Sequence, residues 1–315
     1  MNSNMKVVQK MAQLCKQHPR PVMAAAAAVG GYAVFRTIML MCAVGKQISA
    51  QVNFKNLERD TVHLFIHHRW SHGPNYFPAC LKVETFLRLA KIPYTVHFTS
   101  DASASPTGRL PFIVYNGTVI GDSEFIVQFL KEEFKVTMDD HLTPEEQAIG
   151  LITRRLAETS LNYGLQRTML VDRPELMQDV FAKEYQLDPT MAQSLVHSMR
   201  GTLIKVLNTI GYGNVPQEQY PQEFLREVES LETLLSFKPF LLGSKPTSYD
   251  CAVYGWLHVA VEIGPHGPAM AYLSKSKTLR EYVARVTKLA FPDIKELNTL
   301  DETQRFIPYK ESASL

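Results

Sequence analysis

The sequence predicts an α/β domain over residues 61–135, followed by an all-helical domain over residues 141–298. In the first region, two runs rich in β-branched and aromatic residues flank one amphipathic helical segment. Asn116 and Gly117 then mark a tight hairpin between two further apolar runs. From residue 141 onward, apolar residues recur at helical spacing. The predicted fold class is therefore α/β plus all-α.

The first predicted strand is "TVHLFIHH", residues 61–68. It is apolar on both faces, as expected for a central strand that is covered on both sides. "YTVHF", residues 94–98, is the second strand. A helix between the two makes residues 61–98 a βαβ unit with parallel strands and a right-handed crossover.

The helix between these strands is expected to begin at Pro78, because proline suits the first position of a helix. Glu84 and Arg88 are four residues apart and are expected to pair on its solvent side. The helix ends before Pro93. Its apolar stripe consists of Cys80, Val83, Leu87 and Ala90.

The rest of the α/β domain predicts a hairpin and a second helix. The hairpin strands are "FIVY" and "TVI", residues 112–115 and 118–120. Asp122 or Ser123 is expected to cap the helix that follows. The order of elements, βαβ-ββα, is the thioredoxin-like layout. The side of the second helix predicted to be buried carries Phe125, Ile126, Phe129 and Leu130.

The helical domain carries three clear helix starts. In "TPEEQA", Thr143 and Glu146 have capping-box spacing, with a proline in the first helical position. "TSYD" places Thr247 and Asp250 at the same spacing. Asp188, followed by a proline, begins another helix.

Charge is divided unevenly along the chain. Residues 1–57 contain seven Lys and Arg and no Asp or Glu, so their net charge is +7. The remaining residues carry 26 basic and 31 acidic side chains, a net charge of −5. A basic nucleic-acid-binding face is therefore not expected in the folded body, and no nucleic-acid partner is predicted. The four cysteines form no CxxC motif and no ladder of spacings, which favours a reducing compartment.

The basic leader, residues 1–60, contains a hydrophobic segment at 22–44 that is long enough to span a bilayer. Arg36 in its middle costs roughly 2.5 to 3.5 kcal/mol, which the surrounding large apolar residues can offset. A membrane anchor, a transit peptide and a soluble helix all remain open for this segment. Residues 299–315 are assigned to a C-terminal tail.

Over roughly residues 61–298, the chain resembles the glutathione transferase superfamily. The resemblance rests on "RLPFIVYNGTVIGDS", with a proline at the start of the third strand, a hairpin and an acidic residue before Ser, and on the "TSYD" box. "FPACLKVETFLRL", together with "LPFIVYNG" and "SEFIVQFL", is similar to the failed axon connections and cadmium-responsive branch, and more loosely to the metaxins. The resemblance implies a thioredoxin-like N-terminal domain and a helical C-terminal domain of glutathione transferase type.

The resemblance also implies glutathione as a co-substrate. It implies a cis bond between Leu110 and Pro111, so that the backbone of Leu110 hydrogen-bonds the cysteinyl part of glutathione. Asp122 and Ser123 match the pair that holds the γ-glutamyl group, in which the acid attracts the ammonium and the hydroxyl and helix amides attract the carboxylate. A plain helix cap is the alternative for this pair. Arg109 either counters the charge of glutathione or is a solvated loop residue.

A glutathione thiol ionises at neutral pH only with help from a helix N-terminus, a cation or a hydrogen-bond donor. Relatives in this branch have Ser-Pro-x-Cys where this chain has Phe77 to Cys80, and Phe has no donor. Tyr76 is the predicted catalytic substitute. Cys80 lies on the apolar stripe, which favours core packing. Lesser candidate donors are Ser71, Asn75 and the amide of Ala79.

Four histidines, His63, His67, His68 and His72, raise the question of a metal site. In a strand, His63 and His67 share a face while His68 points away, and no acidic or Cys partner lies nearby in the sequence. No metal site is predicted.

Two functions are consistent with these observations. The first is a glutathione-binding enzyme that transfers glutathione to a small electrophile or reduces a peroxide, with weak or specialised activity in detoxification or stress response. The second is a non-catalytic adaptor at an organelle membrane, in protein import like the metaxins or as a signalling scaffold. We expect a cytosolic body anchored through residues 22–44 to a mitochondrial or other organelle membrane, and a homodimer by analogy alone.

Overall fold

The chain divides into two units, Met1–Asn56 and Leu57–Leu315. All elements below belong to the second unit. The predicted membrane segment at 22–44 lies outside the described residues and stays a prediction. Where the structure does describe the chain, no helix combines the length and apolar composition that a membrane span requires. A computed structural model describes residues 54, 56–215, 219–297 and 303–306.

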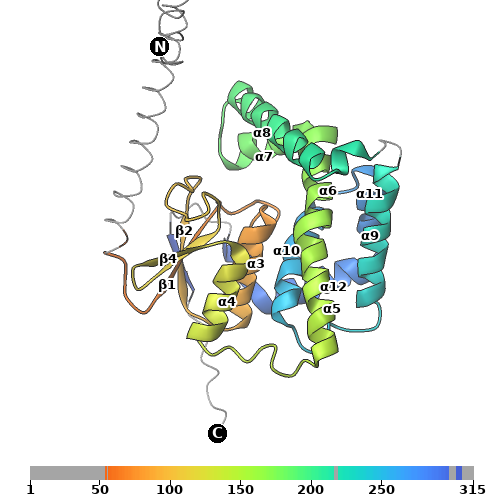
Figure 1. Cartoon of the computed structure of the whole chain (residues 1–315). Coiled ribbons are helices and arrows are strands. Elements are labelled where there is room, and N and C mark those ends of the chain that lie inside the picture. The colour runs from red at the N-terminus through yellow and green to blue at the C-terminus, as the bar shows by residue number, and fades with distance from the viewer. Residues whose placement is uncertain (1–53, 55, 216–218, 298–302, 307–315) are drawn as a thin grey trace, which may run out of the picture. The chain divides into compact units, whose positions relative to one another are not determined.

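The α/β half is built on one five-stranded mixed sheet, in the order β4-β3-β1-β2-β5 (Figure 1). β1 and β2 are parallel, as a βαβ unit requires, and the other pairs are antiparallel. β1 is the central strand and four of its five residues are buried, which confirms the prediction from its apolar pattern. The strands are β1 (Val62–Ile66), β2 (Tyr94–Phe98), β3 (Phe112–Tyr115), β4 (Thr118–Gly121) and β5 (Thr303–Phe306).

Two helices of the α/β half, α3 (Pro78–Leu89) and α4 (Ser123–Glu133), lie between the sheet and the helical half (Figure 1). Pro78 begins α3, as predicted. Asp122 caps α4, and this start turns Ile126, Val127 and Leu130 inward. The prediction that Phe125 is buried is wrong, because this side chain precedes the inward stripe and is 62% exposed.

The second half is helical, which confirms the predicted class. The capping boxes at Thr143 and Thr247 are both present, and Asp188 caps α8. Two π-helical segments, η1 (Ala157–Leu161) and η2 (Thr168–Asp172), flank α6. The other helices are α5 (Pro144–Leu156), α6 (Asn162–Arg167), α7 (Pro174–Glu184), α8 (Pro189–Thr209), η3 (Tyr212–Asn214), α9 (Tyr220–Leu235), α10 (Ser248–Ile263), α11 (Gly267–Lys275), α12 (Lys277–Ala290) and α13 (Ile294–Leu297).

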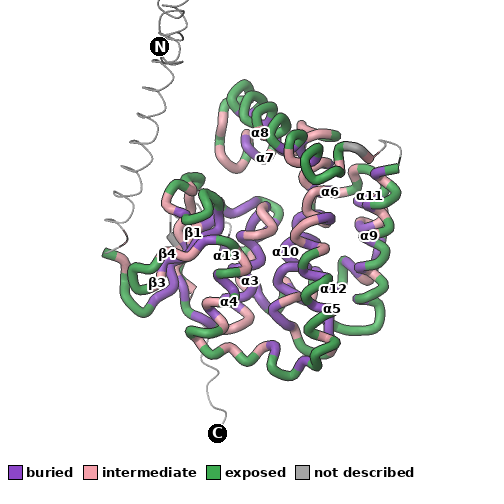
Figure 2. The backbone as a smooth tube through the Cα atoms, viewed as in Figure 1, coloured by how far each residue is buried: buried purple, intermediate pink, exposed green. Residues whose placement is uncertain are grey.

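Helix α10 joins the two halves by packing against α3. Gly255 makes this close approach possible, since a Cβ at this position would lie 2.6 Å from the carbonyl oxygen of Pro78. Residues of α10 are buried along most of the helix, including Tyr254 and Trp256 (Figure 2). The start of α3 is therefore held in place by the core of the helical half.

Glu84 and Arg88 of α3 are both buried, so the prediction that they pair on the solvent side is wrong. The reason is tertiary: the end of the chain returns to cover this side of α3. Arg88 Nη1 lies 2.6 Å from Asp293 Oδ1, close to the start of α13. The pair itself exists, with Arg88 Nε 3.6 Å from Glu84 Oε1.

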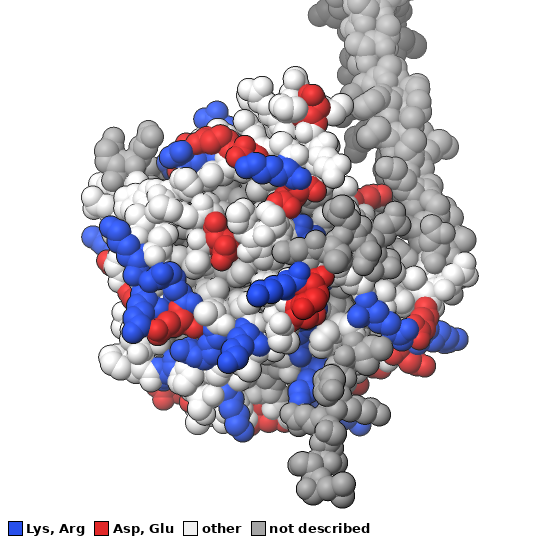
Figure 3. Space-filling view, turned by 180° about the vertical axis from the view of Figure 1, so that it is seen from behind, with Lys and Arg blue, Asp and Glu red and all other residues white. Residues whose placement is uncertain are grey.

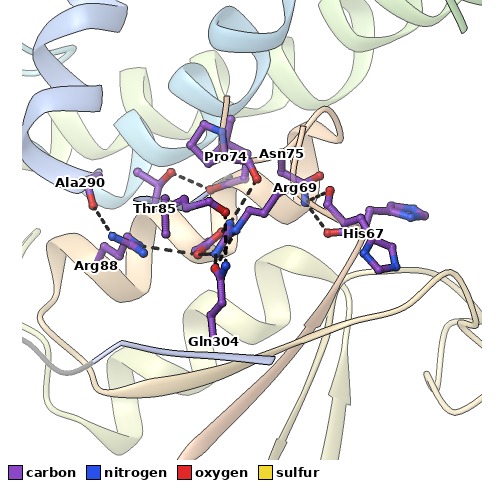
Figure 4. A network of polar contacts seen from close by, with 12 residues as sticks. His67, Arg69, Pro74, Asn75, Thr85, Arg88, Ala290 and Gln304 are labelled. Atoms are coloured by element: carbon purple, nitrogen blue, oxygen red, sulfur yellow. Dashed lines mark hydrogen bonds and ion pairs between the residues drawn. The ribbon is translucent and has the colours of Figure 1, made fainter. Parts of the chain in front are cut away.

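Strand β5 lies within the segment that the sequence pattern left as a tail. Arg69 binds it, because Nε and Nη2 donate to Gln304 Oε1 at 3.1 and 3.0 Å (Figure 4). The same guanidinium binds Glu84 and the carbonyl of Pro74. β5 is thus attached to the sheet by backbone pairing with β2 and to the interior by Gln304 and by Phe306, whose ring lies against Arg88 and Tyr94.

Charges of both signs are mixed on the face shown in Figure 3, where Lys and Arg side chains lie beside Asp and Glu side chains. Exposed ion pairs occur among the described residues, such as Arg305 with Glu58 at 3.1 Å. Opposite charges that lie side by side weaken each other's field over short distances.

Candidate functional site

A polar cavity of about 470 Å³ lies where the two halves meet. Its walls come from the start of α3, the loop before β3, the turn between β4 and α4, and the run from α5 to α6. Its volume is in the range of roughly 300 to 1,000 Å³ that small-molecule sites occupy. Five of the six predicted site residues line it, namely Arg109, Leu110, Pro111, Asp122 and Ser123.

The Leu110–Pro111 peptide bond is cis, as predicted. Pro111 directly precedes β3, which places the bond at the entry to the sheet. Leu110 is buried, whereas Arg109 is exposed at the edge of the cavity. Arg155 of α5 is a second exposed cation in the same lining.

Asp122 is the helix cap that the sequence suggested as one of its two roles, and its role in binding a γ-glutamyl group remains a prediction. Its Oδ1 accepts hydrogen bonds from the amides of Glu124 and Phe125, at 2.9 and 3.4 Å, so it is the helix cap. Its backbone has φ 69°, a left-handed conformation that non-glycine residues rarely adopt and that recurs at functional sites. Asp122 Oδ2 and the Ser123 hydroxyl have no hydrogen-bond partner among the described residues, and both residues line the cavity.

A charge cluster of Lys82, Glu124, Arg154 and Glu158 lies beside this cavity, and the sequence pattern did not reveal it. Lys82 Nζ lies 2.6 Å from Glu124 Oε2 and 2.5 Å from Glu158 Oε1. Arg154 Nη1 lies 2.7 Å from Glu124 Oε2 and 3.3 Å from Glu158 Oε2. The Lys82 side chain is 2% exposed, so solvent screens these pairs weakly. The only signal in the sequence was a lysine among apolar positions of α3.

The cluster connects the two halves across the cavity. Lys82 and Glu124 belong to α3 and α4, whereas Arg154 and Glu158 belong to α5 and the π-helical segment η1. Three of the four residues line the cavity, Arg154 being the exception. π-Helical turns are rare and occur often at functional sites, and η1 supplies Ala157, Glu158 and Thr159 to this lining.

The start of α3 offers backbone groups rather than a side-chain donor. Phe77 is the N-cap residue, and its amide donates to Asn75 Oδ1 at 2.9 Å. The amide of Ala79, in the first turn, has no hydrogen-bond partner within the described residues. Cys80 is fully buried and burial raises the pKa of its thiol, which agrees with a packing role.

An apolar cavity of about 420 Å³ adjoins the polar one. Phe77, Pro78, Asn162 and Gln166 line both. Of residues 199–214, only Met199 reaches this lining. Most of the wall comes instead from α6, η2 and α7, through Leu165, Met169, Leu170, Met177 and Phe181.

Tyr76 lines the apolar cavity and not the polar one. The hydroxyl of Tyr185 donates to that of Tyr76 at 3.2 Å and lies 3.1 Å from His67 Nδ1. Burial raises the pKa of Tyr76 far above its ordinary value and lowers the pKa of His67 to about 4. All three groups are therefore uncharged at neutral pH. As a donor to a glutathione thiol, Tyr76 remains a prediction.

The histidines of the first strand hydrogen-bond to other groups. His63 Nδ1 lies 3.0 Å from His97 Nε2, and His63 Nε2 lies 2.9 Å from the carbonyl of Glu58. His67 contacts Tyr185, as above. Within the described ranges, no three His, Cys, Asp or Glu side chains are grouped so as to hold a metal ion.

Two protein-family models match this chain. The model of the glutathione S-transferase N-terminal domain matches residues 78–174, and the model of the C-terminal domain matches residues 225–286. Together they cover about half of the chain. The chain belongs to the glutathione S-transferase superfamily. The polar cavity of this superfamily member is built from both matched regions, since it runs from α3 to α10.

Curated relatives of this glutathione S-transferase-like chain include failed axon connections, a metaxin and a glutathione S-transferase. Failed axon connections of Drosophila melanogaster is 28% identical and covers 82% of this chain and 65% of its own length. Metaxin-1 of Macaca fascicularis is 28% identical, covering 71% of this chain and 74% of its own. Isoprene-epoxide–glutathione S-transferase of Rhodococcus sp. (strain AD45) is 27% identical, covering 68% and 93%. The chain thus spans less than two thirds of failed axon connections.

A solved structure supports the fold assignment. The glutathione transferase of Phanerochaete chrysosporium covers 74% of this chain and 99% of its own, with a TM-score of 0.50 and 14% identity. At this identity the likeness concerns the fold alone, a thioredoxin-like half followed by a helical half. The glutathione S-transferase fold predicted from the sequence is confirmed.

Proposed function

We propose that the protein binds glutathione in the polar cavity and presents its sulfur to an apolar molecule in the adjoining cavity. The observation that carries this proposal is the meeting of the two cavities at Phe77 and Pro78. The reaction class is glutathione transfer to an electrophile, or reduction of a peroxide, at low or specialised rates.

The charges of the polar cavity complement those of glutathione, which has one ammonium and two carboxylates. Asp122 Oδ2 and the Ser123 hydroxyl have no partner among the described residues and can bind the γ-glutamyl group at the start of α4. Arg109 and Arg155 are exposed cations that can pair with carboxylates. Sites with both signs of charge favour zwitterions over simple anions, which supports a tripeptide over an inorganic ion.

Thiol activation in this proposal comes from the backbone. The amide of Ala79, which no described residue accepts from, and the partial positive charge at the start of α3 can both stabilise a nearby thiolate. A side chain with a hydroxyl would add a second, stronger donor, and Phe77 lacks one. We therefore expect a thiol pKa that is lowered less than in enzymes with a Tyr, Ser or Cys donor.

Calorimetric titration of the full chain with glutathione tests the binding step. We expect saturable binding by the wild type, and loss of binding when Asp122→Ala and Ser123→Ala are combined. Asp140→Ala is the matched control, because Asp140 is an exposed carboxylate outside the cavity. Equal affinity in all three proteins, or absence of binding by the wild type, would overturn the proposal.

The alternative function is a non-catalytic adaptor. It is favoured by Phe77, which has no hydrogen-bond donor at the position where relatives carry a serine. An adaptor function also agrees with the similarity of the chain to failed axon connections and metaxin-1. Turnover of chlorodinitrobenzene with glutathione distinguishes the two functions. If the wild type is inactive while Phe77→Ser gains activity, the glutathione site is intact and the natural protein acts as an adaptor.

We further propose that residues 22–44 anchor the protein to an organelle membrane, as their length and apolar composition suggest. Alkaline carbonate extraction of membranes from cells that make the full chain, compared with a variant lacking residues 22–44, tests the anchor. Recovery of both proteins in the soluble fraction would contradict it. Sedimentation equilibrium would test the expected homodimer.

A further inference from the structure

The boundary between the two cavities has polar side chains on one side only. The residues that line both cavities are Phe77 and Pro78 at the start of α3, and Asn162 and Gln166 on α6. Neither Phe77 nor Pro78 has a side chain that can donate a hydrogen bond. Asn162 and Gln166 each end in a primary amide, which has two N–H donors and one oxygen acceptor. The side-chain donors at this boundary therefore come from the helical half.

The packing of α6 fixes which side of this helix faces the boundary. Asn162 and Gln166 are four residues apart, so they lie one turn apart on the same side of α6. Gly164 and Leu165 of the same helix are buried. A Cβ at Gly164 would lie 2.5 Å from Cε2 of Phe224, so α9 packs directly against the backbone of α6. Rotation of α6 about its axis would break this contact, and the two amides therefore stay at the boundary.

Both amides are available to a ligand. Asn162 and Gln166 are half-buried, and neither side chain has a hydrogen-bond partner among the described residues. Lys82, which lines the polar cavity, is already paired with Glu124 and Glu158. The hydrogen-bonding groups of the two amides are thus left for a molecule that occupies the cavities.

A thiolate matches these donors. In the proposed function, the sulfur of glutathione lies where the polar cavity meets the apolar one, which is the position of Asn162 and Gln166. A thiolate only accepts hydrogen bonds, and bonds to an ionised acceptor are stronger than bonds to a neutral one. The amide N–H groups therefore stabilise the thiolate more than the thiol, which lowers the pKa of the thiol.

We propose that the side-chain amides of Asn162 and Gln166 donate hydrogen bonds to the sulfur of bound glutathione. They take over from α6 part of the role that a hydroxyl at position 77 would have. The proposal rests on the proposed function for the position of the sulfur. On ionisation the S–H bond breaks, the proton passes to solvent water and the electron pair stays on the sulfur. The amides keep their own protons, so they act by stabilising a charge and not as bases.

The test is the ionisation of the glutathione thiol when the full chain is saturated with glutathione, followed through the ultraviolet absorbance of the thiolate as the pH is raised. Asn162→Leu and Gln166→Met remove the donors and nearly keep the size of each side chain. With both changes combined, the ratio of thiolate to thiol at neutral pH is expected to fall about ten-fold, which corresponds to about 1.4 kcal/mol. Each single change is expected to lower the ratio about three-fold.

S-Methylglutathione separates this proposal from the proposed function, since it has the same charged groups as glutathione and no thiol proton. Calorimetry should show equal affinity for it in the wild type and all variants. If the wild type does not bind it, the glutathione site is absent and both proposals fail. If every protein binds it and the thiol of glutathione titrates alike in the wild type and the double variant, only the role of the amides is overturned. Weaker binding of S-methylglutathione by the variants would also overturn that role, because the amides would then bind the peptide and not the sulfur.

Gln178→Met is the matched control, because Gln178 of α7 is also half-buried and lines neither cavity. With this change the thiol is expected to titrate as in the wild type. A fall in the thiolate ratio equal to that of Gln166→Met would overturn the proposal. The melting temperature of each variant shows whether it is folded, and the single variants decide the question if the double variant is not.

Discussion

Arg69 and Glu84 form a bidentate ion pair in the interior, with Nη1–Oε2 and Nη2–Oε1 distances of 2.5 and 2.7 Å. Glu84 is fully buried and also accepts a hydrogen bond from the Tyr94 hydroxyl at 2.8 Å. Burial by itself would raise the pKa of Glu84, but Arg69 and Arg88 hold it below its ordinary value. The contact between α3 and the sheet therefore depends on a carboxylate that stays ionised.

Glu84→Gln is expected to change the acid sensitivity of the fold. Because the folded pKa lies below the unfolded value of 4.5, Glu84 stabilises the protein above that pH and loses this contribution as the pH falls. Near neutral pH the variant should lose about 3 kcal/mol, since buried Arg69 is left without its carboxylate, whereas Arg88 keeps Asp293. Urea unfolding at several pH values measures both effects. Identical pH dependence in wild type and variant would contradict the assignment.

Lys82→Met is expected to destabilise the protein by about 2 kcal/mol, because the partly buried carboxylates of Glu124 and Glu158 lose one of their two cations. The free energy of unfolding in urea measures the loss. Lys205→Met is the matched control, an exposed lysine on α8 whose replacement should have little effect. A loss of similar size in both variants would show that the cluster contributes nothing specific.

Asp122→Asn separates the two roles of this residue. Asn caps helices about as well as Asp, so the melting temperature should be unchanged. The negative charge is lost, and glutathione affinity should fall about ten-fold if the carboxylate binds the ammonium. Asp122→Ala should lose the cap as well, at about 1 kcal/mol. Unchanged affinity in Asp122→Asn would leave Asp122 as a helix cap only.

His258→Phe is expected to reduce the loss of stability in mild acid. His258 is buried in α10, neither ring nitrogen has a hydrogen-bond partner among the described residues, and burial lowers its pKa to about 4. The unfolded chain takes up this proton near pH 6.5 and the folded chain does not, so stability falls as the pH drops from 6.5 towards 4. Thermal unfolding across this range, compared between wild type and variant, should show a shallower slope for the variant. Parallel slopes would refute this.

Gln304→Leu tests how β5 is attached. It leaves the Nε and Nη2 protons of Arg69 without the oxygen that accepts them, which should cost about 1 to 2 kcal/mol. Gln304→Glu is the matched control, because it keeps an acceptor of the same length. Urea unfolding should rank wild type and Gln304→Glu above Gln304→Leu. Equal losses in both variants would point to the amide group rather than to the acceptor.

The predicted site residues lie in one cavity for a local reason. Pro111 directly precedes β3 and Asp122 directly follows β4, and Phe112 pairs with Gly121 in the hairpin, so these site residues lie close together because of the hairpin at Asn116. Tyr76 could not be placed in the same way, because the side of α3 on which its ring lies depends on Tyr185 and the packing of α7. The charge cluster was hidden for a similar reason, since its members are 42 to 76 residues apart where they pair with Lys82.

The sequence by itself determined the two fold classes, the parallel βαβ unit, the hairpin and the helix caps. These features depend on short-range periodicity and on backbone groups that neighbouring residues satisfy. Only the tertiary structure decided that Glu84 and Arg88 are buried, that Thr303–Phe306 completes the sheet, and that two cavities meet at Phe77. Those outcomes depend on which distant segments pack against a side chain and exclude water from it. The spacing of apolar residues along one helix or strand does not specify such long-range contacts.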